Sequence, residues 1–192
     1  VDLSSYDTMD SHSSSTINLE NVFVTEANLI VDEGEGFRHI ESCLPQILLC
    51  LSAEALGIME VLNKLTVEYS KTRKQFGAPI GSFQALQHRM VDNFMAFEQA
   101  KSMVYRGICE STSFNQNDID INQFLKTAHA VKAMIAKNSK QIGDESIQIH
   151  GGIGMTDELN IGHLVKRLMM INTTFGDANY HRNRFIETAY AA

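Results

Sequence analysis

Apolar and polar residues alternate over short distances in the first 36 residues. Ile17 and Leu19 are separated by a polar residue, and the apolar runs Val22–Val24 and Leu29–Val31 follow, each bounded by Asn, Glu, Thr or Ser. This pattern of short apolar runs between polar residues predicts short strands joined by turns. Because three or so strands form only a marginal unit without a covering layer, residues 1–36 are expected to be the end of a β domain whose beginning is missing.

From Gly36 onward the apolar residues recur every three or four positions, which predicts amphipathic helices. Pro45 is compatible with the first helix only if it lies in the first turn, and Ser82 is the expected N-cap of the second. Gly151 and Gly152 are expected to end the third, since residues without Cβ can adopt left-handed geometry. The helices are predicted at residues 40–70, 83–108, 122–149, 158–171 and 177–190.

Long helices with short connections indicate a mainly α fold, an antiparallel helical bundle preceded by a few β-strands. The predicted domains are therefore residues 1–36, the end of the β domain, and residues 37–192, the bundle.

Charge and cysteine content narrow the classes of partner. Sixteen basic and 23 acidic residues give a net charge of −7, which argues against nucleic acid or an anionic membrane surface as the main partner. Three cysteines without metal-ligand spacing indicate reduced thiols in a cytoplasmic protein. No apolar run approaches 18 residues, so no membrane span is expected.

A carboxylate-bridged metal site in a bundle needs Glu-x-x-His motifs on facing helices. No glutamate here is followed three residues later by histidine, and none of the seven histidines pairs with another at helical spacing. The sequence therefore predicts no metal site, and ordinary surface or capping roles for the histidines.

Three features are ambiguous when considered one at a time. The glycines of GGIG (residues 151–154) suit a helix C-cap, but they would also let a phosphate or a base approach the backbone. Arg73 and Lys74 could be solvated or could bind phosphate. Glu54 lies in the most apolar run, LLCLSAEALGIM, where a buried carboxylate must pair, hydrogen-bond or shift its pKa upward; a structural role is favoured over a catalytic one.

Taken together, the motifs AEALG, RKQFG, FQALQHR and QIHGGIG, in this order and at this separation, resemble the acyl-CoA dehydrogenase family. The resemblance covers nearly the whole chain and implies the C-terminal half of such an enzyme, without the N-terminal helical domain and most of the middle β domain. It also implies FAD as cofactor, an acyl-CoA substrate, an electron-transfer acceptor protein as partner, and a homo- or hetero-oligomer. In that family a glutamate removes the α-proton of the thioester while the β-hydride passes to the flavin.

The resemblance also assigns cofactor contacts. In the family, loops of one subunit's bundle hold the adenosine-diphosphate end of the FAD that is lodged in its neighbour. The positions that match in this chain are Arg73, Gln75, Phe76, Gln84, Gln148, Gly151 and Gly152.

The catalytic base does not match the family pattern. Phe175 occupies the position where most members have the glutamate, and Ile47 the position used by a minority. Glu54 and Asp177 are the weak substitutes, and Asp177 would place negative charge near the diphosphate of the chain's own FAD site.

Two hypotheses therefore remain open: a catalytic subunit with a relocated base, or a non-catalytic subunit of a heteromeric enzyme whose partner carries the glutamate. The second resembles the small subunits of bacterial pimeloyl-CoA and steroid side-chain enzymes. A plain interaction bundle unrelated to flavin is disfavoured by the intact RKQFG and QIHGG motifs.

Overall fold

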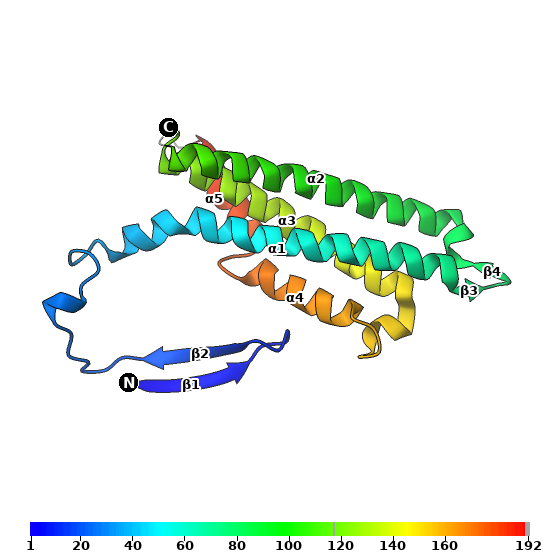
Figure 1. Ribbon diagram of the computed structural model, residues 1–192, viewed down its shortest axis with the longest axis horizontal. Coiled ribbons are helices and arrows are strands. Elements are labelled where there is room, and N and C mark those ends of the chain that lie inside the picture. The colour runs from blue at the N-terminus through cyan, green and yellow to red at the C-terminus, as the bar shows by residue number, and fades with distance from the viewer. Residues whose placement is uncertain (117, 191–192) are drawn as a thin grey trace.

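The computed structural model describes residues 1–116 and 118–190, so the last two residues of the predicted bundle domain lie outside the described part. The chain begins with a β-hairpin and continues into a helical bundle (Figure 1). In chain order the elements are β1 (Asp2–Asp7), β2 (Ser13–Asn18), the 3₁₀ turn η1 (Glu26–Asn28), α1 (Gly36–Thr72), β3 (Lys74–Gln75), β4 (Ala78–Pro79), η2 (Ile80–Ser82), α2 (Gln84–Asn115), α3 (Ile121–His150), η3 (Gly151–Met155), α4 (Ile161–Thr173) and α5 (Ala178–Tyr190).

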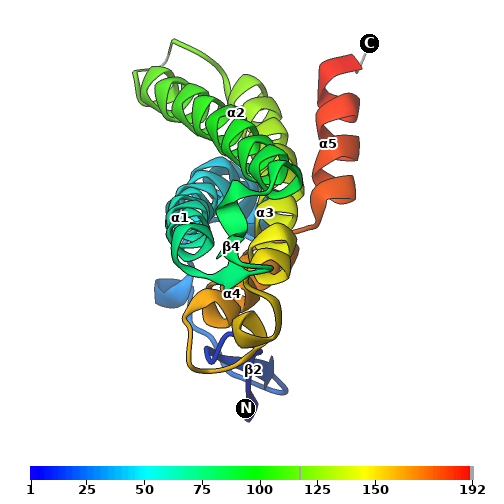
Figure 2. The same ribbon diagram turned by 90° about the vertical axis from the view of Figure 1, so that its right-hand side faces the viewer.

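Helix α3 forms the centre of the bundle and packs against α1, α2, α4 and α5 (Figure 2). Its buried stripe includes Phe124, Val131, Ile135 and Ile142, at the three- and four-residue spacing that the sequence predicted. These side chains share one core with apolar residues of the other helices, namely Leu49, Ala55, Met59 and Leu62 of α1, Ala96, Phe97, Ala100 and Val104 of α2, and Ile161, Leu168 and Ile171 of α4. The predicted helical bundle is confirmed.

The ends of α3 follow from local chemistry. The Asp120 side chain accepts a hydrogen bond from the Gln123 backbone N–H at 2.8 Å, which caps the first turn. At the other end Gly151 has φ +67°, a conformation that favours glycine, and the helix ends there as predicted.

The N-terminal strands differ from the prediction. β1 and β2 pair antiparallel, with Asp2 opposite Asn18, so a strand begins far earlier than the apolar runs suggested. The runs Val22–Val24 and Leu29–Val31 are not strands, and Phe23 and Ile30 are 89% and 96% exposed. The strand predicted around Ile17 is confirmed as β2, whereas the strands predicted at the two apolar runs are wrong, because neither run has a neighbouring strand to pair with its backbone groups.

Two predictions about helix starts are also wrong. α1 begins at Gly36, so Pro45 lies inside the helix rather than in its first turn. Proline removes one backbone hydrogen bond there, but the buried side chains of Leu48 and Leu49 tie the following turn into the core. Ser82 does not cap α2: its hydroxyl donates to the Pro79 carbonyl at 2.7 Å within η2, and Phe83 is the N-cap residue.

Helix α1 contains an 18-residue window with a mean hydropathy of 1.5, so by length and composition alone it could cross a membrane. The sequence prediction of no membrane span rested on the absence of long unbroken apolar runs. The mean hydropathy of this helix does not support that prediction. The core helix of a soluble protein passes the same test, and α1 packs against α2, α3 and α4.

Candidate functional site

One end of the bundle brings together five segments that are distant in sequence. The last turn of α1, the β3–β4 hairpin, the start of α2, the end of α3 and the turn η3 meet there (Figures 1 and 2). Tyr69 of α1 stacks on His150 of α3 with 4.4 Å between ring centroids, and its hydroxyl donates to the His150 carbonyl at 3.3 Å. These contacts join the two helix ends. We call this region the contact end.

The RKQFG motif forms a tight hairpin at the contact end. Lys74 pairs with Pro79 and Gln75 with Ala78, so Phe76 and Gly77 are the two central residues of the turn. Both have positive φ, +53° and +81°, as a two-residue hairpin turn requires. Because the side chain of Phe76 sits at the tip of this hairpin, it is 95% exposed.

The QIHGG motif lies at the end of α3, where Gln148 is exposed on the last turn. Gly151 needs glycine for its positive φ. Gly152 has no such need, because a Cβ atom built on it would meet nothing within 4 Å. Nothing in the chain's own fold explains a residue without a side chain at position 152.

All seven residues that the resemblance assigned to the cofactor are exposed, and all belong to the segments of the contact end. They are Arg73, Gln75, Phe76, Gln84, Gln148, Gly151 and Gly152. No carboxylate of residues 1–116 or 118–190 lies within 4.0 Å of the Arg73 guanidinium, so its charge is free to bind an anion. The arrangement is an outward-facing surface rather than an enclosed cavity.

The chemistry of this donor set fits the adenosine-diphosphate end of FAD. A guanidinium presents several N–H donors suited to phosphate oxygens, and an open glycine lets a ligand approach the backbone. The exposed Phe76 ring adds an apolar face beside them. The residues fit a contact with a group that is held elsewhere, since all seven are exposed on the surface.

The predicted base positions hold no proton acceptor. Phe175 is 55% exposed in a turn where its φ is +60°, and Ile47 is 36% exposed on α1. Asp177 caps α5, because its carboxylate accepts a hydrogen bond from the Tyr180 backbone N–H at 2.7 Å.

Glu54 is exposed, although it lies in the most apolar run of the sequence. Its two carboxylate oxygens accept hydrogen bonds from Nε and Nη2 of Arg167 at 2.5 and 2.8 Å. These hydrogen bonds lower the pKa of Glu54. The same guanidinium binds Asp10 in the β1–β2 turn through Nη1 at 2.8 Å, and so ties the hairpin to α1 and α4. Because Arg167 stabilises the ionised form of Glu54, this carboxylate is a poor proton acceptor.

Sequence reasoning missed a buried polar cluster between α3 and α5. His129 and His181 are 1% and 0% exposed, so the prediction of ordinary surface or capping histidines is wrong for both. Lys132 is also fully buried. Helical spacing could have shown this, because position 132 lies four residues after Ala128 and three before Ile135, on the buried stripe of α3.

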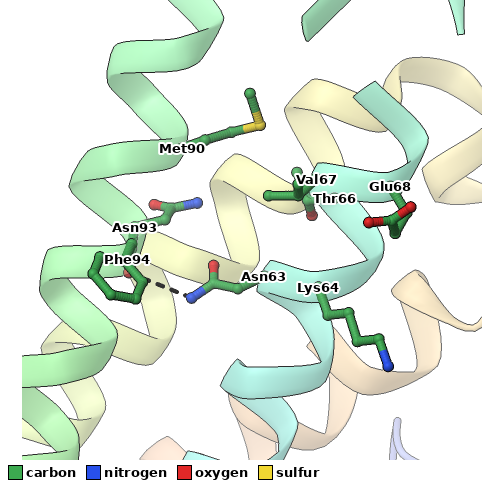
Figure 3. A pocket seen from close by; sticks show the side chains of 8 residues that line it. All are labelled: Asn63, Lys64, Thr66, Val67, Glu68, Met90, Asn93 and Phe94. Atoms are coloured by element: carbon green, nitrogen blue, oxygen red, sulfur yellow. Dashed lines mark hydrogen bonds between the residues drawn. The ribbon is translucent and has the colours of Figure 1, made fainter. Parts of the chain in front are cut away.

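A cavity of about 270 Å³ lies between α1 and α2 (Figure 3). Val67, Met90 and Phe94 give it apolar walls, and it contains none of the predicted site residues. The Asn93 amide beside it is buried and makes no hydrogen bond to the described residues. In the same part of the chain, no cluster of three or more His, Cys, Asp or Glu side chains could hold a metal ion.

Comparison with known proteins places these features in a family. Residues 34–189 match the family described as acyl-CoA dehydrogenase, C-terminal domain. A short-chain-specific acyl-CoA dehydrogenase of Megasphaera elsdenii is 32% identical over 154 residues, 79% of this chain and 38% of that protein. A probable acyl-CoA dehydrogenase of Bacillus subtilis is 31% identical over 182 residues, 93% of this chain and 46% of that protein.

The structural comparison agrees. The solved structure of butyryl-CoA dehydrogenase from Megasphaera elsdenii superposes with a TM-score of 0.85 at 26% identity, covering 97% of this chain and 47% of that one. This chain therefore spans less than half the length of these relatives. The chain belongs to the acyl-CoA dehydrogenase family and comprises its C-terminal helical domain with a short preceding hairpin.

Proposed function

We propose that this chain is the C-terminal part of an FAD-dependent acyl-CoA dehydrogenase subunit, and that its contact end binds the adenosine-diphosphate portion of FAD held by a neighbouring subunit. The observation that carries the proposal is the contact end itself. Seven exposed residues converge there, with the charge of Arg73 unneutralised and open space at Gly152. Family members bind FAD, as a solved structure of the relative PigA with FAD and proline illustrates.

The proposed roles follow from the side chains. Arg73 would bind diphosphate oxygens, Gln148 and Gln75 would hydrogen-bond the nucleotide, and Gly152 would allow it to lie against the backbone. When bound, FAD supplies the hydride acceptor for α,β-dehydrogenation of an acyl-CoA thioester. The contribution of this chain is to hold and orient the cofactor, which requires a second subunit.

A second subunit is also supported by an exposed apolar stripe along α2. Val91, Phe94, Met95, Tyr105 and Ile108 are between 48% and 58% exposed. Exposed apolar stripes of this kind are typical of helix–helix interfaces between subunits. The proposed assembly is a homo- or hetero-oligomer in the cytoplasm that passes electrons to an acceptor protein.

The geometry favours a heteromeric enzyme over a catalytic subunit with a relocated base. Phe175 cannot accept a proton, and Glu54 is held in a two-point ion pair with Arg167. In this proposal the partner chain carries the glutamate, and this chain completes the partner's FAD site.

The test uses the complete protein, co-expressed with its partner chain. Arg73→Ala removes a charge-assisted contact and should weaken FAD binding about 10-fold or more. Gly152→Ala should also lower FAD occupancy without changing the melting temperature of the cofactor-free protein, because its Cβ meets nothing in the chain. Flavin absorbance after gel filtration measures occupancy.

Arg38→Ala is the matched control, since Arg38 is an exposed arginine near the opposite end of α1. It should leave FAD occupancy unchanged. Equal occupancy in wild type, Arg73→Ala and Gly152→Ala would show that the contact end does not bind the cofactor.

A further inference from the structure

Helix α5 is attached to the bundle through a pair of buried histidines. Nδ1 of His129 on α3 lies 2.8 Å from Nδ1 of His181 on α5. Both rings are buried, and Nε2 of His181 makes no hydrogen bond to the described residues. At this distance one ring must carry its proton on Nδ1 and donate it to the lone pair of the other. The contact therefore exists only while at least one ring is neutral.

The same face of α3 also holds the loop that precedes α5. Lys132, one turn after His129, donates to the Ile171 carbonyl at 2.6 Å, in the last turn of α4, and to the Gly176 carbonyl at 3.5 Å. α3 thus contacts the chain on both sides of Phe175, at Ile171 and at Gly176. Figure 2 shows α5 beside α3.

The surroundings of the pair oppose extra positive charge. Burial is the main cause that lowers the pKa of His129 to about 4, and Arg184 adds to it while Glu187 opposes it. Burial also lowers the pKa of His181 to about 4, reinforced by His129 and Lys132 and opposed by Asp177 and the Gly176 backbone. Arg184 also pairs with Glu41 of α1 at 3.8 Å, a second contact of α5 with the bundle, and Arg38 and His129 line the same cavity.

We propose that the His129–His181 pair is a proton-sensitive clasp that holds α5, and with it the loop 174–177, onto α3. In the neutral state one Nδ1–H donates to the other Nδ1. When both rings are protonated no lone pair remains, and two N–H groups face each other across 2.8 Å. Acid therefore releases α5 and frees the loop, while the apolar core of α1, α2 and α3 stays packed.

The expected size of the effect follows from linkage. Detaching α5 exposes the rings to water, where a histidine takes up its proton near pH 6.5 rather than near 4. Between pH 7 and pH 5 the detached state is favoured by about 20-fold for one histidine, and by more if both take up protons. Lowering the pH shifts the equilibrium toward detached α5, because the detached state binds more protons over this range.

Hydrogen–deuterium exchange of the chain at pH 7 and pH 5, corrected for the intrinsic exchange rate, tests the proposal. Amides of residues 178–190 should lose more than about 20-fold of their protection at pH 5, because both rings are exposed, whereas amides in the middle of α3 should not. His181→Asn keeps a polar group at the Nδ1 position but cannot titrate, so it should remove the part of the pH dependence that His181 contributes and leave only the part from His129. His88→Asn, at an exposed histidine on α2, should preserve it.

Two outcomes would overturn the clasp. One is the same loss of α5 protection in wild type and in His181→Asn. The other is a result of ¹⁵N NMR on the wild-type protein, which needs no variant. If the ring nitrogens of His129 and His181 titrate near pH 6.5 while the amides of α5 stay protected, the clasp is refuted. If His181→Asn fails to fold, this measurement decides alone.

Discussion

Lys132 gives the sharpest quantitative test of the buried cluster. It is fully buried, and no carboxylate among residues 1–116 and 118–190 lies within 4.0 Å of its ammonium, which contacts only backbone carbonyls. Burial lowers the pKa of Lys132 from its ordinary value of 10.5 to about 8, and Asp177 opposes the shift. The folded chain therefore releases this proton at lower pH than the unfolded chain does.

The sign of the pH dependence of stability follows from this difference in proton binding. Between pH 8 and 10.5 the unfolded state binds more protons than the folded state, so the free energy of unfolding rises with pH. Integrating between pH 7.5 and 9.5 gives about 2 kcal/mol from this single group. Lys132→Met has a side chain of similar length without the charge, and this contribution should vanish in the variant.

Urea unfolding of wild type and Lys132→Met at both pH values measures the difference, and other titrating groups cancel in the comparison. Lys137→Met, at an exposed lysine on the same helix, should keep the wild-type pH dependence. The reasoning is refuted if Lys132→Met retains the full alkaline gain in stability, because the gain would then come from other groups.

Two further predictions concern catalysis and backbone geometry. Glu54→Gln and Asp177→Asn in the complete co-expressed enzyme should leave turnover largely intact, since neither residue is proposed as the base; loss of turnover with FAD still bound would place the base in this chain. Gly176→Ala should destabilise the chain by about 2 kcal/mol or more in thermal unfolding, because φ is +119° and the new Cβ would lie 2.3 Å from the Tyr180 ring. Gly57→Ala, in open space on helix α1, should be neutral or slightly stabilising, and equal destabilisation of both variants would contradict this account.

The helices could be predicted because their signal is long and local. The stripe of Phe124, Val131, Ile135 and Ile142 repeats over most of α3, so an error at one position leaves the pattern intact. A short apolar run has too few positions for a repeating pattern to be recognised with the same certainty. Val22–Val24 and Leu29–Val31 have strand-like composition, but strand formation depends on a partner that the residues themselves do not specify.

The turns of the contact end were partly predictable for the same reason. The glycine at position 151 allows the positive φ that ends α3, and this requirement is local. The partners of Glu54 and His181 were not predictable, because Arg167 is 113 residues from Glu54 and His129 is 52 residues from His181. Such pairings depend on which helix faces meet in three dimensions.

The site residues separate into two groups, and this separation agrees with the two-chain enzyme proposed above. The side chain of Arg73 is exposed, and a Cβ at Gly152 would meet nothing within 4 Å, so both positions are accessible to another molecule. Glu54 is engaged by Arg167, which ties the β1–β2 turn to the bundle, so its charge serves the chain's own architecture. A carboxylate held ionised by a bidentate guanidinium would have to break two charge-assisted hydrogen bonds before accepting a proton. In the proposed two-chain enzyme the base is a glutamate of the partner chain, which leaves this ion pair intact during turnover.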